Sequence, residues 1–183
     1  MTSQGGNLLG KERTSSIPVR LVMNVSGYGI DLHVGNRVID MEDFLTTAVK
    51  ALEHLVASGA IDKFPNIIAL QSEKCDPLYQ ARMQGLDQPA TVPPTPTMAE
   101  GIAIGVPMRG KEILGMMRKH DMKVVTCPED KILEARGALA RRGIYCEHTT
   151  AANFAAWLHY CELYGPTPDT LITMCGAGIK SDH

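Results

Sequence analysis

The sequence shows no marked excess of charge of either sign and no long hydrophobic run. Its 183 residues include 18 Lys and Arg against 20 Asp and Glu, a formal net charge of −2. A near-neutral chain lacks the basic surface that attracts nucleic acid or anionic membranes, so we expect neither as a partner. No apolar run approaches the roughly 20 residues needed to cross a bilayer. Residues 1–16 also lack the apolar core of a signal peptide, so we expect a cytoplasmic protein.

Motifs for metal binding and disulfide formation are also missing. The five cysteines are odd in number, widely spaced and form no CxxC pair, a pattern typical of reduced, buried thiols. The six histidines are scattered, with no HxxxH or HExxH motif. His54 lies on a predicted helix without clustered ligands, so we interpret it as structural or solvated. We predict no metal site.

What the sequence does contain is a regular alternation of short apolar runs and helical patterns. Residues 1–16, rich in Gly, Ser and Thr, are a predicted flexible tail, and residues 17–183 a predicted single domain. Apolar runs predict strands at 19–25, 66–71, 122–127 and 170–175, with a further extended segment at 144–148. Helical spacing predicts helices at 42–59, 77–83, 111–120, 128–142 and 149–164.

This alternation predicts an α/β fold of three layers: a mostly parallel sheet with helices on both faces. Asp40 is the expected cap of the 42–59 helix and Gly59 its end. Thr149 or Thr150 is the expected cap of the last helix. Residues 87–97 contain four prolines and cannot hold a regular ladder, so they are predicted to form a surface loop within the domain.

The last predicted strand runs into a turn, Cys175-Gly176-Ala177-Gly178. Glycine has no Cβ and allows another group to approach the backbone closely. Ligands of parallel sheets bind beyond the carboxyl ends of the strands, which makes this turn a candidate site. The alternative is an ordinary turn at a strand end.

Four stretches together resemble the fold type II pyridoxal-phosphate enzymes, a family that includes threonine synthase, threonine dehydratase and the tryptophan synthase β-chain. The stretches, in chain order, are SGAIDKFPNIIALQSEKCDPLYQA (58–81), TMAEGIAIGVPMRGKEIL (97–114), PEDKILEARGALARRGIYCEHTTAANFAAWL (128–158) and the terminal MCGAGIKSD. The resemblance covers roughly residues 34–182. It implies the tryptophan synthase β-like fold and pyridoxal 5'-phosphate as cofactor. It also implies elimination or replacement at the β or γ carbon of a small amino acid.

The resemblance assigns roles to residues of the terminal turn. Cys175 takes the place of a small hydroxyl or thiol side chain near the pyridine nitrogen of the cofactor, and Gly176 and Gly178 would let the ring edge lie against the backbone. Glu100 is placed near the ring. The alternatives are that Cys175 is a small buried hydrophobic residue and that Glu100 is a solvated loop carboxylate.

Two other parts of the family's site are poorly matched. The lysine that binds the cofactor belongs to an N-terminal half with an Asn/Ser-Phe-Lys-Asp-Arg-like motif, which this chain lacks. The nearest counterpart of that lysine is Lys11 in GNLLGKERT (6–14). The alternative interpretation is that Lys11 is an exposed lysine in a polar tail. Of the glycine-rich phosphate loop, which precedes a helix, only Gly35 and Asn36 remain. Gly27 and Gly29 could supply amides instead.

We therefore interpret the chain as the cofactor-side domain of a threonine synthase-like lyase or synthase, in a truncated, split or divergent form. We expect it to act as a homo-oligomer or with a complementing chain that carries the N-terminal half. The alternative is a non-catalytic module of the same half-fold, for small-ligand binding or assembly.

Overall fold

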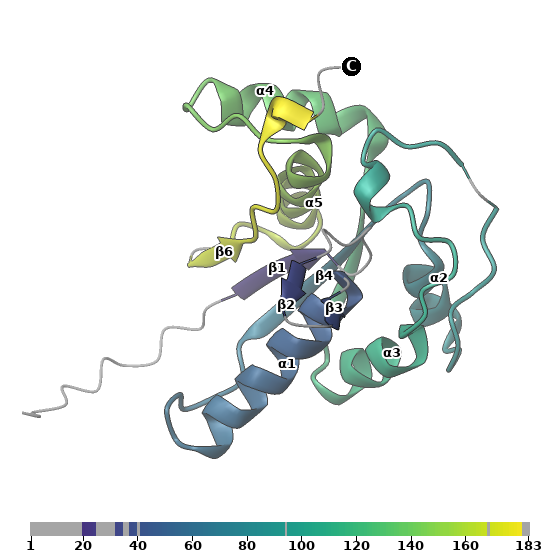
Figure 1. Cartoon of the computed structure of the whole chain (residues 1–183), viewed down its shortest axis with the longest axis vertical. Coiled ribbons are helices and arrows are strands. Elements are labelled where there is room, and N and C mark those ends of the chain that lie inside the picture. Colours follow the sequence, from purple (N-terminus) through teal and green to yellow (C-terminus); the bar gives the residue numbers. More distant parts are fainter. Residues whose placement is uncertain are drawn as a thin grey trace, which may run out of the picture.

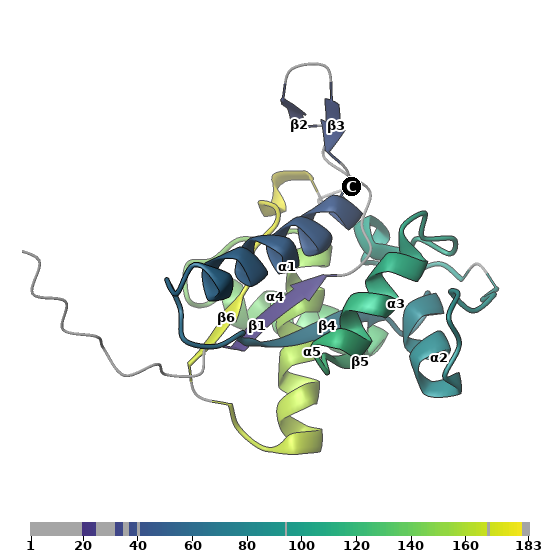
Figure 2. The same ribbon diagram turned by 90° about the horizontal axis from the view of Figure 1, so that it is seen from below.

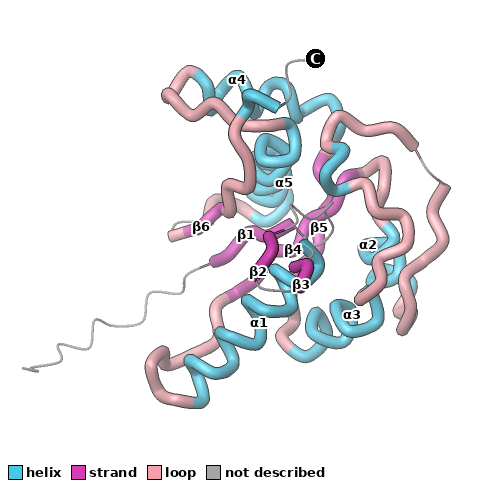
Figure 3. Tube along the Cα trace, in the orientation of Figure 1, coloured by secondary structure: helices cyan, strands magenta, loops and turns pink. Residues whose placement is uncertain are grey.

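Four parallel strands form the central sheet of the protein, in the order β5-β4-β1-β6 (Figures 1 and 3). The computed structural model describes residues 20–24, 32–34, 37–39, 41–93, 95–167 and 169–180. The strands are β1 (Arg20–Asn24), β4 (Asn66–Ser72), β5 (Lys123–Cys127) and β6 (Thr170–Ile172). The predicted parallel sheet is therefore confirmed, although β6 ends at Ile172, before the predicted end at residue 175.

In the described part of the chain five α-helices connect these strands, and four of them lie within two residues of their predicted bounds. They are α1 (Met41–Ala57), α2 (Pro77–Gln84), α3 (Gly110–Lys119), α4 (Ile132–Ala140) and α5 (His148–Tyr164). The predicted 128–142 helix is interrupted: a 3₁₀ turn, η2 (Glu129–Lys131), precedes α4. Gly59, with a φ of 71°, follows α1 as expected.

Each face of the sheet is covered by a different set of helices (Figures 1 and 2). Ile67 and Ala69 of β4 pack with side chains of α1, α2 and α3. Ile68 and Leu70, on the opposite face, pack with side chains of α4 and α5. A strand buried on both faces is an unbroken apolar run, which explains the sequence of β4 and confirms the three-layer α/β fold.

The order of the strands reverses at β1. The chain passes from β1 to its neighbour β4 and on to β5, and then returns through α4 and α5 to β6 on the other side of β1. Because β1 and β6 are parallel neighbours, their carboxyl ends lie at the same edge of the sheet. In open α/β sheets such a reversal leaves a crevice that binds ligands.

A small antiparallel hairpin stands between β1 and α1. It consists of β2 (Leu32–Val34) and β3 (Arg37–Ile39) and projects from the body of the molecule in Figure 2. The sequence did not predict it, because strands of three residues carry too little pattern to be recognised. Within the part of the chain that the structure describes, no helix combines the length and apolarity needed to span a membrane.

A buried glutamine joins the end of β4 to the start of α2. The side chain of Asp76, at the N-cap of α2, makes no capping hydrogen bond to the helix backbone. Instead, the Oε1 atom of the fully buried Gln71 accepts hydrogen bonds from the backbone N–H groups of Leu78 and Tyr79, each at 2.9 Å. Gln71 thus satisfies two amides that the first turn of a helix leaves unpaired.

We predict that Gln71→Leu lowers the free energy of unfolding by about 1–3 kcal/mol, because two buried amides lose their acceptor. Chemical denaturation of the two proteins measures this change. Gln84→Leu, at the exposed end of the same helix, is the matched control and should alter stability by no more than about 0.5 kcal/mol. Equal effects of the two substitutions would contradict the capping role of Gln71.

Candidate functional site

Three chain segments meet beyond the carboxyl ends of the strands: the 97–103 loop, residues 145–150 at the start of α5, and the terminal turn, residues 173–178. The Cα of Gly101 lies so close to Thr149 that an added Cβ would be 2.7 Å from the threonine Oγ1. An isolated antiparallel bridge joins Cys146 to Ala177. The start of α5 is therefore the common support of the other two segments.

One buried hydroxyl group holds the terminal turn against α5. The Oγ1 atom of Thr150 accepts hydrogen bonds from the backbone N–H groups of Cys175, at 3.2 Å, and Gly176, at 3.0 Å. The prediction that Thr149 or Thr150 caps this helix is wrong, because the helix begins at His148 with Glu147 at the N-cap. Thr150 lies inside the first turn, where its hydroxyl is committed to the terminal turn.

The two glycines of the turn allow residues 145–147 to approach it. A Cβ on Gly176 would lie 2.4–2.6 Å from the carboxylate atoms of Glu147, and a Cβ on Gly178 2.7–2.9 Å from the ring of Tyr145. A side chain at position 178 would collide with the Tyr145 ring, whereas one at position 176 would require the flexible Glu147 carboxylate to move. Contact of these glycines with a cofactor stays a prediction.

An arginine of α4 fastens the same turn from outside. The Nε of Arg136 donates a hydrogen bond to the carbonyl oxygen of Cys146 at 2.8 Å, and its Nη2 donates one to that of Gly178 at 3.5 Å. Its guanidinium carbon lies 5.0 Å from the centre of the Tyr145 ring, within cation–π range. Arg136 thus connects α4 with both segments joined by the Cys146–Ala177 bridge.

Cys175 is partly exposed and keeps its proton. Burial raises the pKa of its thiol, an effect partly opposed by the hydrogen bond from Asn153, whose Nδ2 lies 3.6 Å from the sulfur. The Nδ2 of Asn153 also donates to the carbonyl oxygen of Thr173 at 2.8 Å. Among the described residues, the Oδ1 of this fully buried side chain has no hydrogen-bond partner. The turn therefore presents a neutral thiol beside an unsatisfied buried acceptor.

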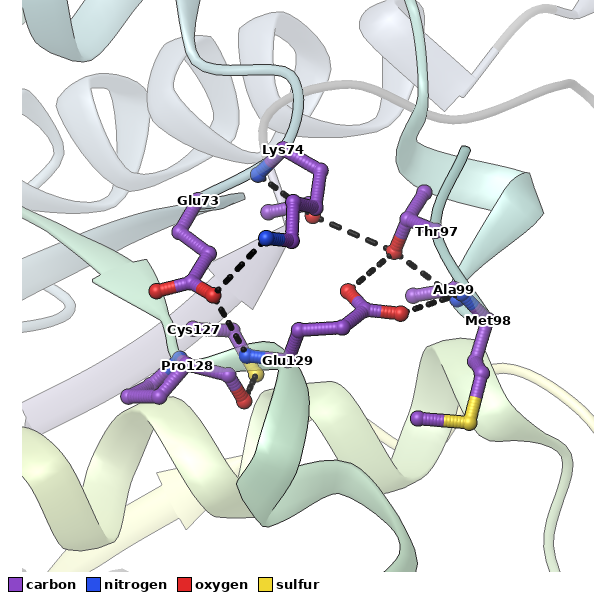
Figure 4. A network of polar contacts seen from close by, with 9 residues as sticks. Glu73, Lys74, Thr97, Met98, Ala99, Cys127, Pro128 and Glu129 are labelled. Carbon is purple, nitrogen blue, oxygen red and sulfur yellow. Dashed lines mark hydrogen bonds and ion pairs between the residues drawn. The ribbon is translucent and has the colours of Figure 1, made fainter. Parts of the chain in front are cut away.

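A carboxylate at the end of β5 holds the 97–103 loop in place (Figure 4). Glu129 accepts hydrogen bonds from the Oγ1 of Thr97 at 2.6 Å and from the backbone N–H of Met98 at 2.5 Å. The Thr97 hydroxyl also accepts one from Ser72 Oγ, at the end of β4. The backbone N–H of Glu129 in turn donates to the side chain of Glu73 at 3.1 Å. The loop is therefore anchored at the ends of two neighbouring strands.

The structure brings only some of the predicted site residues together. Cys175, Gly176 and Gly178 lie in the terminal turn, and Glu100 is an exposed residue of the 3₁₀ turn η1 (Glu100–Ile102) in the adjacent loop. The other predicted residues lie outside the described residues: Lys11, Gly27, Gly29, Gly35, Asn36 and the expected helix cap Asp40. Among the described residues no group of three His, Cys, Asp or Glu side chains is placed to share a metal ion.

Three residues that support the terminal turn were not predicted from the sequence: Glu147, Thr150 in its observed role, and Asn153. All three lie within one segment, 147–153, that was assigned to an extended stretch and a helix. The Asn153 side chain is fully buried, and buried asparagine is uncommon. An asparagine on an otherwise apolar helix face was the one signal that could have identified it.

The residues present fit the ring side of a pyridoxal cofactor. A pyridine nitrogen is a hydrogen-bond acceptor, and a protonated, partly exposed thiol can donate to it. The thiol of Cys175 meets both conditions, whereas the thiol of Cys127 is fully buried, with its pKa raised to about 12 chiefly by burial. Cys175 is thus the better placed of these two cysteines to meet a ligand at this edge.

A family model described as pyridoxal-phosphate dependent enzyme matches residues 45–176. Among solved structures, a threonine deaminase from T.th. matches with a TM-score of 0.62 and 19% identity, over 89% of this chain and 50% of that chain. Serine racemase from Dictyostelium discoideum matches with a TM-score of 0.57 and 15% identity, over 92% and 46% of the chains. A fungal L-serine ammonia-lyase from Rhizomucor miehei matches with a TM-score of 0.62 and 13% identity, over 87% of this chain and 45% of that chain.

These three structures share the fold of the chain, at identities too low to indicate more than the fold. The chain spans about half the length of each. The match agrees with the resemblance found in the sequence, including its restriction to one half.

We predict that Thr150→Val loosens the terminal turn, because the amides of Cys175 and Gly176 lose their shared acceptor. The free energy of unfolding should fall by about 1–3 kcal/mol, and Cys175 should react faster with iodoacetamide, as measured by peptide mapping. Thr150→Ser keeps the hydroxyl and should react at the wild-type rate. An unchanged Cys175 reaction rate in the valine variant would show that the turn is held by other contacts.

Proposed function

Because the family match spans most of its length, the chain belongs to the pyridoxal-phosphate dependent enzymes, and we propose that it is the cofactor-side domain of a threonine synthase-like lyase or synthase. The observation that supports this proposal most directly is the position of the terminal turn. Cys175 follows β6, the neighbour of β1, at which the order of the strands reverses. The proposed site therefore lies at the edge of the sheet where ligands of such sheets bind.

In this proposal Cys175, Gly176 and Gly178 would hold the ring of the cofactor. The Cys175 thiol, kept protonated because burial raises its pKa, would donate a hydrogen bond to the ring nitrogen and leave the ring uncharged. A neutral ring nitrogen moderates the ring's capacity to accept electrons, which suits elimination or replacement at the β or γ carbon of a small amino acid. Thr150 holds the backbone of Cys175 at this position.

Gly35 and Asn36 are the residues that the resemblance assigns to the phosphate group. They fall between β2 and β3, so β3 separates them from the start of α1 at Met41, where backbone N–H groups and the helix dipole could bind phosphate. We assign Gly35 and Asn36 to the phosphate on the resemblance alone, and Cys175, Gly176, Gly178 and Glu100 to the ring.

The lysine that holds the cofactor is the part of the site that this chain matches least, since Lys11 lies in a polar, predicted flexible tail. The cofactor supplies carbanion stabilisation when bound, while a lysine of the protein must hold it and move the proton. We propose that a complementing chain with the N-terminal half supplies this lysine. The second candidate is a non-catalytic ligand-binding module, favoured by the neutral thiol and the unsatisfied Asn153 Oδ1, which need no lysine to bind a ligand.

The first test is binding of pyridoxal 5'-phosphate by Cys175 variants. Cys175→Ser keeps a small hydrogen-bond donor and should retain affinity within a few fold, whereas Cys175→Leu should lose at least about tenfold, equivalent to ~1.4 kcal/mol. Quenching of the fluorescence of Trp157, the one tryptophan of the chain, measures binding. Cys161→Leu, on the far part of α5, is the control for replacing a thiol by leucine. Equal affinities of wild type and Cys175→Leu would remove Cys175 from the site.

The second test concerns catalysis by the isolated chain. We predict no stable visible absorbance band of defined stoichiometry with pyridoxal 5'-phosphate, and no release of ammonia or keto acid from threonine or serine above a free-cofactor control. The reason is geometric: the base must lie within roughly 3 Å of the proton it removes. A lysine on a segment that the sequence predicts to be flexible would forgo the positioning advantage, which can reach about 7–11 kcal/mol of barrier.

Borohydride reduction followed by peptide mapping identifies any lysine that reacts. A single labelled residue at Lys11 together with turnover would contradict the prediction and make the chain a complete enzyme. The Lys11→Arg variant, which cannot be labelled at that position, is the control.

A further inference from the structure

A buried asparagine of α5 lies directly behind the Cys175 thiol. Asn153 is fully buried on a helix whose neighbouring buried residues, such as Ala152 and Ala156, are small and apolar. Burying an amide costs stability unless its polar atoms are hydrogen-bonded, and among the described residues the Oδ1 of Asn153 has no partner. An unsatisfied buried group of this kind calls for an explanation other than packing.

One backbone carbonyl group fixes the orientation of the Asn153 carboxamide. The Nδ2 of Asn153 lies 2.8 Å from the carbonyl oxygen of Thr173, which can only accept a hydrogen bond. The amide nitrogen must therefore face the terminal turn, with Oδ1 on its other side. The same nitrogen lies 3.6 Å from the Sγ of Cys175. Asn153 accordingly donates to the sulfur and does not accept its proton.

The sulfur of Cys175 is an acceptor on the side that faces the protein. Burial raises the pKa of the thiol, and the hydrogen bond from Asn153 is the largest influence that lowers it. The carboxylate of Glu147 raises the pKa, whereas hydrogen bonds from Thr173 and Thr150 lower it. The polar side chains around the sulfur are thus arranged as donors to it.

The proton of this thiol has no acceptor within the described part of the chain. The hydrogen bond that Cys175 makes with Asn153 is one that the sulfur accepts. The thiol of Cys127 behaves differently, because it donates to the carbonyl oxygen of Pro128 at 3.5 Å. Since Cys175 is also partly exposed, its proton is available to a ligand.

We propose that Asn153 is a positioning residue, whose amide occupies the inner side of the Cys175 sulfur and so directs the thiol proton outward, toward a bound ring. This inference rests on the proposed function, because the ring it serves is that of pyridoxal 5'-phosphate. A donor at this place selects a ring nitrogen that carries no proton, since a protonated nitrogen would present a second donor. Asn153 thereby influences ligand specificity through Cys175.

Alkylation of Cys175 in the cofactor-free protein tests the positioning role. Its rate with iodoacetamide, followed by peptide mapping over a range of pH, gives the midpoint of thiol ionisation and the plateau rate. Asn153→Leu removes the donor at a similar side-chain volume, so the midpoint should move to higher pH. Below the midpoint, the rate relative to its plateau should fall roughly two- to tenfold, the effect of one hydrogen bond. A turn that was merely loosened would shift the midpoint to lower pH, since better solvation favours the thiolate.

Arg136→Lys is the matched control. Arg136 fastens the same turn through the carbonyl oxygens of Cys146 and Gly178, and lysine keeps the positive charge but not the forked contact. The midpoint for Cys175 in this variant should equal that of the wild type or lie below it. Circular dichroism of both variants checks the fold. An unchanged or lowered midpoint in Asn153→Leu, or an equal rise in Arg136→Lys, would overturn the positioning role.

A measurement on the wild type does not depend on the folding of an Asn153 variant. The infrared difference between wild type and Cys175→Ser isolates the S–H stretching band of Cys175. Without cofactor, this band should lie at the frequency of a thiol in contact with water. Bound pyridoxal 5'-phosphate should move it to lower frequency, because the ring nitrogen accepts a hydrogen bond from the thiol. A band that is already low in the cofactor-free protein would show that a protein group holds the proton, and would overturn the inference.

Ligand preference separates this inference from the proposed function. The wild type should bind pyridoxal 5'-phosphate at least about tenfold more tightly than the analogue with a C–H group in place of the ring nitrogen. Asn153→Leu should reduce this preference to within about threefold, and an undiminished preference would overturn the role of Asn153. A wild type that bound neither compound would overturn the proposed function, whereas a raised thiol midpoint in Asn153→Leu would still establish that Asn153 orients the thiol.

Discussion

Burial of the parallel sheet on both faces is the constraint on which the rest of the structure depends. Because both faces are covered, the chain leaves the core at the ends of the strands. The backbone polar groups at these ends need hydrogen-bond partners. In this protein, buried and half-buried polar side chains satisfy them. Gln71 serves the start of α2, Thr97 and Glu129 serve the 97–103 loop, and Thr150 serves the terminal turn. Each of these residues joins two segments, so separate polar contacts at the carboxyl edge hold the connecting segments on the apolar core.

The helices and strands of the core could be predicted from the sequence because a buried segment has a pattern of apolar residues that is visible within the segment itself. The run from Ile67 to Leu70 is apolar at every position, and the helices carry the spacing of one buried face. The polar residues that hold the terminal turn show no such local pattern. Thr150 looks like a helix cap in the sequence, and its actual partners are 25 and 26 residues away. Roles of that kind are fixed by tertiary contacts, which no local pattern encodes.

The terminal glycines show why similarity of a motif is weaker evidence than the structure around it. Gly176 and Gly178 resemble the family's glycine turn, yet each also lies close to a side chain of the chain itself, Glu147 or Tyr145. At Gly178 the Tyr145 ring would favour glycine even in a chain that no longer bound a cofactor. The identity of residue 175 is different, because a partly exposed thiol has no packing role that requires sulfur. Cys175 therefore carries more information about ligand binding than the glycines beside it.

Because β6 is short, we expect the segment that follows it to unfold locally before the core of the sheet. The three residues of β6 pair with β1 alone among the described strands, so residues 173–178 depend on contacts outside the sheet: the bridge between Cys146 and Ala177 and the side chains of α4 and α5. Segments with few ladder hydrogen bonds open at a lower free energy than the core, as separate cooperative units. The residues proposed to meet the ring therefore lie on a unit that can detach while the remaining strands stay folded. A ligand that bound only the closed unit would raise its stability in proportion to the logarithm of the ligand concentration, and amide exchange in residues 173–178 would slow accordingly.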